Sequence, residues 1–202
     1  MSMNFASILK GRVAESVLTA LLERSGYRVT RLGVEVLFDE VKYLDLQQYQ
    51  QLNLPEQLRS LPDLLVADAE VEHAYLVEVK LRKRFDAETA RELSDTLRKQ
   101  RQHWPQAHCA VMLAEPMIPK GRFHQDYIRT LPLESSDRLV APFYDAFEDE
   151  SERMATMWDH LPQLQDVFRY FYQGKGNEAR GVQGQRNADF ITAALRDLKN
   201  LG

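Results

Sequence analysis

Three tripeptides in this sequence place an acidic residue two positions before a lysine. They are Glu40-Val41-Lys42, Glu78-Val79-Lys80 and Asp197-Leu198-Lys199. Such a pair could hold a hard divalent cation beside an amine, which is one half of a site for metal-assisted hydrolysis of phosphate esters. Because acids and lysines are common in this chain, chance alone accounts for matches of this kind. The surroundings of each motif must therefore show which of the three could form such a site.

A second carboxylate distinguishes the motif at Glu78 from the other two. Mg²⁺ prefers oxygen ligands and keeps several waters, so at least two carboxylates should converge on it. Asp63 follows Pro62 at the start of a predicted strand, fifteen residues before Glu78. A hairpin would bring it beside the strand that carries Glu78, where paired positions lie about 5 Å apart. We therefore expect Asp63 and Glu78 to share one cation.

The period of a strand places Glu78 and Lys80 on the same face, opposite to the core-facing Val77 and Val79. The motif at 40–42 has no carboxylate on an adjacent predicted strand. The motif at 197–199 lies in a predicted helix, which splays its acid and its lysine apart. Only the motif at 78–80 has a second carboxylate, Asp63, expected on a neighbouring strand.

Hydrophobic periodicity predicts the elements that position these residues. We expect helices over 11–25 and 87–103, a helix or loop over 44–58, and strands over 27–38, 61–69, 73–82 and 108–115. Gly26 should end the first helix, and Glu15 should lie at the edge of its apolar stripe, within reach of a cleft beside the core. A short turn at 70–72 joins two strands antiparallel, and a helical crossover before 108 favours a parallel pair. The fold class predicted is α/β with a mixed central sheet flanked by helices.

The C-terminal third carries a weaker pattern. We predict an edge strand over 138–144, two short amphipathic helices around Met154–Leu161 and Leu164–Phe171, a glycine-rich linker over 173–187 and a last helix over 188–200. The domain organisation expected is a core over 1–135, with an insertion at about 39–60, and a mostly helical extension over 136–202. This extension should pack on the core or on a partner.

Composition narrows the class of protein further. The chain has 202 residues, 44% hydrophobic and 28% charged, with the single cysteine Cys109 and no apolar run of the ~20 residues that a membrane span needs. We expect a cytoplasmic protein without a membrane partner, with Cys109 in the core. The net charge of -4 is unevenly distributed. Residues 80–104 carry eight basic and four acidic side chains, whereas residues 134–166 carry nine acidic and two basic ones. A local basic field of this kind can hold phosphates.

The ordered combination of "KGRVAESVLTALLERSGYRV", "LPDLLVAD" and "YLVEVKLR" resembles the PD-(D/E)xK, or restriction-endonuclease-like, nuclease superfamily. Within it, the first stretch looks most like the archaeal Holliday-junction-resolvase branch. The resemblance covers roughly the first 115 residues and implies an αβββαβ core. The insertion at 39–60 and the absence of a small-residue loop after the first strand depart from that branch. Restriction, repair, recombination and mobile-element roles therefore stay open.

The resemblance also implies roles for individual residues. Asp63 and Glu78 would be the principal metal ligands, Glu15 would complete the acidic cluster, and Lys80 would position or help to deprotonate the attacking water. The cofactor implied is Mg²⁺, with Mn²⁺ able to substitute. The reaction expected is endonucleolytic hydrolysis of DNA.

Basic residues near this constellation are the candidates for nucleic-acid binding. They are Lys10, Arg12, Arg82, Lys83, Arg84, Arg98 and Arg101. Two alternatives remain open at this point: a catalytically inactive nucleic-acid-binding or assembly module of the same fold, and a nuclease that acts on RNA. We expect a homodimer, because two cuts in a duplex suit a two-fold arrangement.

Overall fold

The computed structural model describes residues 5–38, 41, 43–44, 46–117, 124–140, 147–168, 190 and 193–194. Its helices are α1 (Phe5–Arg24), α2 (Val34–Leu37), α3 (Leu46–Gln51), α4 (Glu56–Arg59), α5 (Ala87–Arg101), α6 (Glu150–His160) and α7 (Leu164–Val167), with the 3-10 helices η2 (His124–Asp126) and η3 (Leu133–Val140). Its strands are β1 (Arg28–Arg31), β2 (Leu64–Ala67), β3 (Ala74–Arg82), β4 (His108–Leu113) and β5 (Ile128–Pro132).

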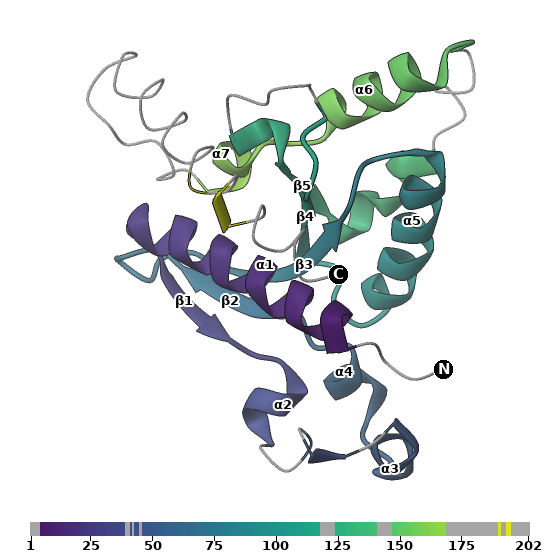
Figure 1. The fold of residues 1–202 in the computed structure, drawn as a ribbon. Coiled ribbons are helices and arrows are strands. Elements are labelled where there is room, and N and C mark those ends of the chain that lie inside the picture. Colours follow the sequence, from purple (N-terminus) through teal and green to yellow (C-terminus); the bar gives the residue numbers. More distant parts are fainter. Residues whose placement is uncertain are drawn as a thin grey trace.

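The strands form a five-stranded mixed sheet in the order β1-β2-β3-β4-β5. The pairs β1–β2 and β2–β3 are antiparallel, β3–β4 is parallel, and β4–β5 is antiparallel. The parallel pair follows the crossover through α5, as a helix between two strands requires. The mixed α/β sheet predicted from the sequence is therefore present, and β3 lies at its centre (Figure 1).

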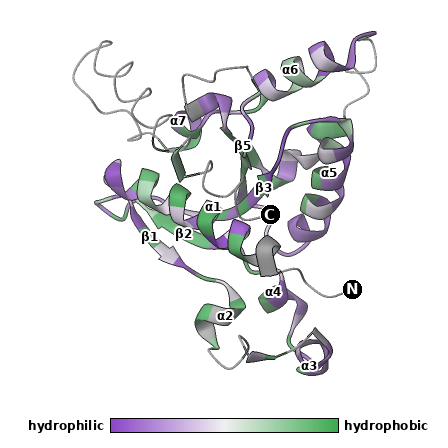
Figure 2. Ribbon diagram, in the orientation of Figure 1, coloured by the Kyte–Doolittle hydropathy of each residue, from purple (hydrophilic) through white to green (hydrophobic). Residues whose placement is uncertain are grey.

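Helices cover both faces of the sheet (Figure 1). On one face, α1 packs through Leu18, Leu21 and Leu22 against Val77 of β3, and Phe168 after α7 joins the same cluster. On the other face, a second cluster joins α5, β4, η3 and α6; its buried members include Leu93, Leu97, Val111, Leu139 and Trp158. Figure 2 shows hydrophobic residues concentrated on β2 and β3, with hydrophilic residues on the outer turns of α5. The sheet is thus the middle layer of three.

Two helix ends follow from local sequence. Gly26 has a φ of 92°, a left-handed conformation that favours glycine, and its N–H donates to the carbonyl of Glu23 at 3.0 Å. The predicted stop of α1 is confirmed. At α5, the Asp86 carboxylate accepts a hydrogen bond from the N–H of Thr89 at 2.9 Å, which caps the helix. The helix that faces the candidate site is therefore fixed at its start.

The structure corrects two predicted strands and adds a third. The strand predicted over 27–38 ends at Arg31, and Val34–Leu37 is helical. Gly33 breaks the extended run, and in the helical turn that follows it Val34 is buried whereas Val36 is exposed. Residues 138–140, predicted as an edge strand, belong to η3, because Leu139 packs inward beside α5. The edge strand is instead β5, which the sequence pattern did not reveal.

Some predictions fall on other parts of the chain. The linker over 173–187 lies outside the described residues, as do Phe171 and most of the helix predicted over 188–200. Within that last stretch, Phe190 and Ala194 are partly buried against the α1 cluster. The predicted amphipathic helices are present as α6 and α7, and Trp158 and Phe168 are core residues.

Candidate functional site

The β2–β3 hairpin sets Asp63 beside Glu78. Leu64 pairs with Val77 in the antiparallel register, so Asp63, one residue before β2, stands next to the Glu78 position. The Asp63 Oδ2 atom accepts a hydrogen bond from the backbone N–H of Val79 at 2.7 Å. The Asp63 side chain thus accepts a backbone N–H of β3 at the point where the backbone pairing between β2 and β3 ends. The predicted neighbourhood of Asp63 and the motif at 78–80 is confirmed.

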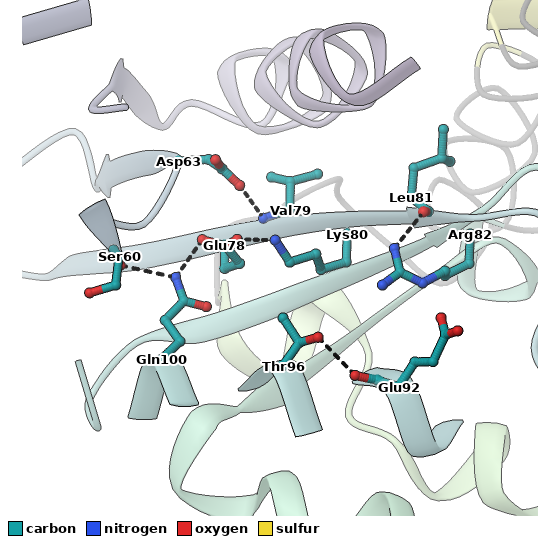
Figure 3. Close-up of polar contacts among 10 residues, drawn as sticks. All are labelled: Ser60, Asp63, Glu78, Val79, Lys80, Leu81, Arg82, Glu92, Thr96 and Gln100. Carbon is teal, nitrogen blue, oxygen red and sulfur yellow. Dashed lines mark hydrogen bonds and ion pairs between the residues drawn. The ribbon is translucent and has the colours of Figure 1, made fainter. Parts of the chain in front are cut away.

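Glu78 is buried on the α5 side of the sheet, with 6% of its surface exposed. Its Oε1 atom forms an ion pair with the Nζ of Lys80, and its Oε2 atom accepts a hydrogen bond from Gln100 Nε2 at 2.6 Å. Figure 3 shows the Asp63 carboxyl approaching β3 at Val79, while Glu78 and Lys80 extend towards Gln100 of α5. Both carboxyls therefore meet the same short stretch of β3.

The electrostatics of this group are strongly perturbed. Burial, followed by the negative charge of Glu78, raises the pKa of Asp63 to about 7, although the Val79 N–H and Lys80 act in the opposite direction. Burial alone would lower the pKa of Lys80, but the Glu78 carboxylate outweighs it, so the pKa of Lys80 is raised. Lys80 is therefore a cation at neutral pH. Asp63, in contrast, exchanges its proton near neutrality.

Gln100 is a site residue that the sequence reasoning missed. It is 8% exposed and contacts both Glu78 and the carbonyl of Ser60, the latter at 3.3 Å. A signal for it was present, because Leu93, Leu97 and Gln100 follow one another at the spacing of the apolar stripe of α5. A polar residue on a core-facing stripe requires a buried partner, and here that partner is the Glu78 carboxylate.

The end of the predicted insertion (39–60) is hydrogen-bonded to α5 and to the residues just after it. The indole N–H of Trp104, one turn beyond Gln100, donates to the carbonyl of Gln57 at 3.3 Å. Together with the contact between Gln100 and Ser60, this bond holds α4 and the end of the insertion against α5. The insertion therefore borders the candidate site.

A divalent cation is compatible with these residues. Asp63 and Glu78 offer hard oxygen donors. Burial and the charge of Glu78 keep the Asp63 carboxyl partly protonated, and a nearby positive ion would favour its ionised form. Within the described ranges, no group of three or more His, Cys, Asp or Glu side chains is arranged to hold a metal ion. Two carboxylates still suit Mg²⁺, which commonly keeps waters and substrate oxygens in its other positions.

Glu15 lies on α1 and influences the site through its negative charge. Its charge contributes to the raised pKa of Asp63, but it is the smallest of the causes. Its role as a third metal ligand stays a prediction.

The basic run at 82–84 is divided by the end of β3. Arg82 is half-buried on the strand, whereas Lys83 and Arg84 are exposed. The guanidinium of Arg84 pairs with Asp86 at 2.7 Å, next to the cap of α5. Arg82 is therefore the member of the run that belongs to the strand of Glu78 and Lys80.

The other basic candidates are placed on two helices. Arg98 and Arg101 of α5 pair with Asp137 of η3 at 3.6 and 2.9 Å, so the structure engages them with an acidic side chain rather than with Glu78 or Asp63. Lys10 and Arg12 lie on α1, where Arg12 is exposed and Lys10 is half-buried. Whether these four residues bind nucleic acid stays a prediction.

Cys109 is buried on β4 in the cluster that faces α5, as expected for a core residue. No helix in the described part of the chain has the length and apolar character needed to cross a membrane.

Comparison with family models, with curated proteins and with solved structures found no significant match. The α/β architecture with its mixed sheet therefore rests on the structure itself. The resemblance to the PD-(D/E)xK superfamily rests on the three quoted stretches.

Proposed function

We propose that this protein is a Mg²⁺-dependent endonuclease that hydrolyses phosphodiester bonds in DNA. The observation that carries the proposal is that two carboxyls, Asp63 and Glu78, meet the stretch of β3 that also carries Lys80. Asp63 accepts the N–H of Val79, and Glu78 forms an ion pair with Lys80. Burial, together with the charge of Glu78, raises the pKa of the half-buried Asp63, and a perturbed carboxyl beside a specific charge partner is a candidate functional group. A site whose compensating positive charge arrives with a bound cation would account for it.

Each of the site residues would have a distinct role in the hydrolysis. Asp63 and Glu78 would hold the cation, which when bound lowers the pKa of a water and neutralises charge that develops on the phosphate. Lys80 is protonated at neutral pH, so it would orient the water and stabilise negative charge rather than accept a proton. Gln100 would keep the Glu78 carboxylate in place through its amide.

A nucleic acid is the substrate favoured by the basic side chains that follow the site along β3. Arg82 and Lys83 come directly after Lys80, where phosphates next to the scissile one would lie. DNA is the form proposed, in line with the superfamily resemblance, and RNA is the alternative substrate.

The test is a cleavage assay with purified protein. Plasmid, branched DNA and structured RNA are incubated with Mg²⁺, with Mn²⁺ or with a chelator, and the products are mapped. Asp63→Asn, Glu78→Gln and Lys80→Ala should each lose cleavage, and the chelator should abolish it. The matched controls are Glu92→Gln and Lys99→Ala, which change exposed residues of the same charge types. Equal cleavage by the wild type and all three site variants would contradict the proposal.

One observation favours a different function, a catalytically inactive nucleic-acid-binding module. Both oxygens of Glu78 already have protein partners, Lys80 and Gln100, as in a purely structural ion pair. In that case the wild type would bind DNA or RNA in a salt-dependent manner and would cut neither in the presence of divalent cations.

A further inference from the structure

Arg82 differs from its basic neighbours in where its side chain lies. It follows Glu78 and Lys80 at every second position of β3, so these three side chains leave the same face of the strand. Figure 3 shows Arg82 on the side of β3 that carries Lys80, with Glu92 and Thr96 of α5 across from it. Both α5 residues are exposed, and Arg82 itself is half-buried.

The guanidinium of Arg82 keeps most of its donors free within the described part of the chain. One terminal nitrogen donates to the carbonyl of Leu81 at 3.0 Å. The Nε atom is buried and has no hydrogen-bond partner among the described residues. An arginine carries five N–H donors in a rigid fork that matches phosphate oxygens. A half-buried guanidinium whose donors are mostly unpaired is therefore suited to an anion.

Arg82 also belongs to the electrostatic surroundings of the site. The thiol of Cys109 on β4 responds to Glu78, Lys80, Asp63 and Arg82 together, and burial is the main cause of its raised pKa. Arg98 and Arg101, in contrast, are occupied by Asp137, and Arg84 is occupied by Asp86. Among the basic candidates of the 82–84 run and of α5, Arg82 is the one beside Lys80 with an unpaired buried donor.

We propose that Arg82 binds the phosphate adjacent to the scissile one, so that side chains of β3 contact two consecutive phosphates of one nucleic-acid strand. Residues 80 and 82 are separated by about 6.6 Å along a strand, which is comparable to the step between successive phosphates of one nucleic-acid strand. Lys80 and the carboxyl pair then face the reacting phosphate, and Arg82 holds its neighbour. This inference rests on the proposed nuclease function and adds a fixed path for the substrate.

The experiment uses the nucleic acid that the wild type cleaves, with the cleavage position mapped. Arg82→Gln should lower kcat/KM about ten- to a hundredfold, chiefly through KM, as expected for the loss of a charge-assisted hydrogen bond. The slope of log Kd against log salt, measured with chelator present, should decrease by about one. Arg28→Gln removes the same charge from an exposed arginine of the edge strand β1, and should change kcat/KM, KM and the salt slope much less.

A chemical substitution in the substrate locates the contact. A neutral methylphosphonate linkage is placed next to the cleavage position, on each side in turn. On one side it should raise the KM of the wild type as much as Arg82→Gln does, and it should add nothing further in the Arg82→Gln protein. Independent, additive losses on both sides would overturn the inference, as would an Arg82→Gln enzyme indistinguishable from Arg28→Gln.

Two readouts distinguish a phosphate contact from a structural role of Arg82. Arg82→Lys keeps the charge and should restore part of the affinity, and thermal unfolding of each variant shows whether the fold is intact. Loss of stability with unchanged KM and salt slope in the folded fraction would make Arg82 a structural residue and overturn the assignment. A wild type that neither binds nor cuts nucleic acid contradicts the proposed function itself, whereas an active enzyme insensitive to Arg82→Gln contradicts only the phosphate contact.

Discussion

The amide nitrogen of Gln100 lies 2.6 Å from the Oε2 atom of Glu78, so a residue of α5 holds the buried acid of β3. Glu78 is 6% exposed, and its other oxygen is paired with Lys80. A buried carboxylate is tolerated when its oxygens have donors, and it becomes costly when one donor is removed. Gln100 therefore stabilises the fold and orients the candidate site at the same time.

Replacing Gln100 with leucine tests how much the hydrogen bond to Glu78 stabilises the fold. We expect the free energy of unfolding to decrease by about 1–3 kcal/mol, because Glu78 Oε2 loses its buried donor. Urea denaturation at neutral pH measures the change. Gln102→Leu alters an exposed glutamine at the end of the same helix and should change stability by less than about 0.5 kcal/mol. Equal effects of the two substitutions would show that the bond to Glu78 contributes nothing.

The pKa of Asp63, raised to about 7, makes stability depend on pH in a definite direction. In the folded protein Asp63 keeps its proton up to about pH 7, whereas in the unfolded chain it loses it near its ordinary value of 3.8. The stabilising contribution of the protonated form is therefore complete below about pH 4. It is lost as the pH rises towards 7, by up to about 4 kcal/mol.

Asp63→Asn removes this titration. Unfolding free energies of the wild type and the variant are compared between pH 4 and pH 8 in the presence of a chelator. The wild type should lose stability relative to the variant as the pH rises through this window. A difference that stays constant, or that grows in favour of the wild type, would show that Asp63 has no raised pKa.

Lys80 is expected to matter for turnover through its charge. Lys80→Met should lower kcat by about 10²- to 10³-fold, the range associated with loss of one group that stabilises developing charge. Because the ammonium is paired with buried Glu78, the variant should also unfold more easily. Lys99→Met, on the exposed side of α5, is the matched control. Retained turnover in a folded Lys80→Met protein would remove Lys80 from the mechanism.

The cap of α5 gives a prediction about the scaffold alone. Asp86→Ala should reduce stability by about 1 kcal/mol, because the N–H of Thr89 loses its acceptor. Asp86→Ser keeps an oxygen at the cap position and should retain most of the stability. Thermal unfolding monitored by circular dichroism measures both. An alanine variant as stable as the serine variant would mean that the Asp86 cap is not a stabilising feature.

The centre of the fold could be predicted from sequence because its signals are local. The apolar alternation around Glu78, the polar turn before it and the position of Asp63 at the start of the preceding strand together define one hairpin register. The period of β3 then places Glu78 and Lys80 on one face, as observed. Gly26 and the apolar stripe of α1 likewise carry their information within a few residues.

The parts that sequence reasoning missed depend on tertiary contacts. β5 has no strong pattern of its own and is specified by pairing with β4, while its Thr130 N–H donates to the carbonyl of Pro162. The sequence around Arg98 and Arg101 gave no sign of Asp137, which η3 brings to them. Gln100 is intermediate, because its place on the apolar stripe was visible although its partner was not.

The central claim is that Asp63 and Glu78 bind one divalent cation, and a crystal grown or soaked with Mn²⁺ tests it most directly. An anomalous difference map, recorded at a wavelength where manganese scatters anomalously, locates the ion without reference to activity. We expect a single strong peak in contact with one oxygen of each carboxyl, and its loss in a Glu78→Gln crystal treated in the same way. A fully soaked wild-type crystal with no manganese between these two side chains would contradict the account.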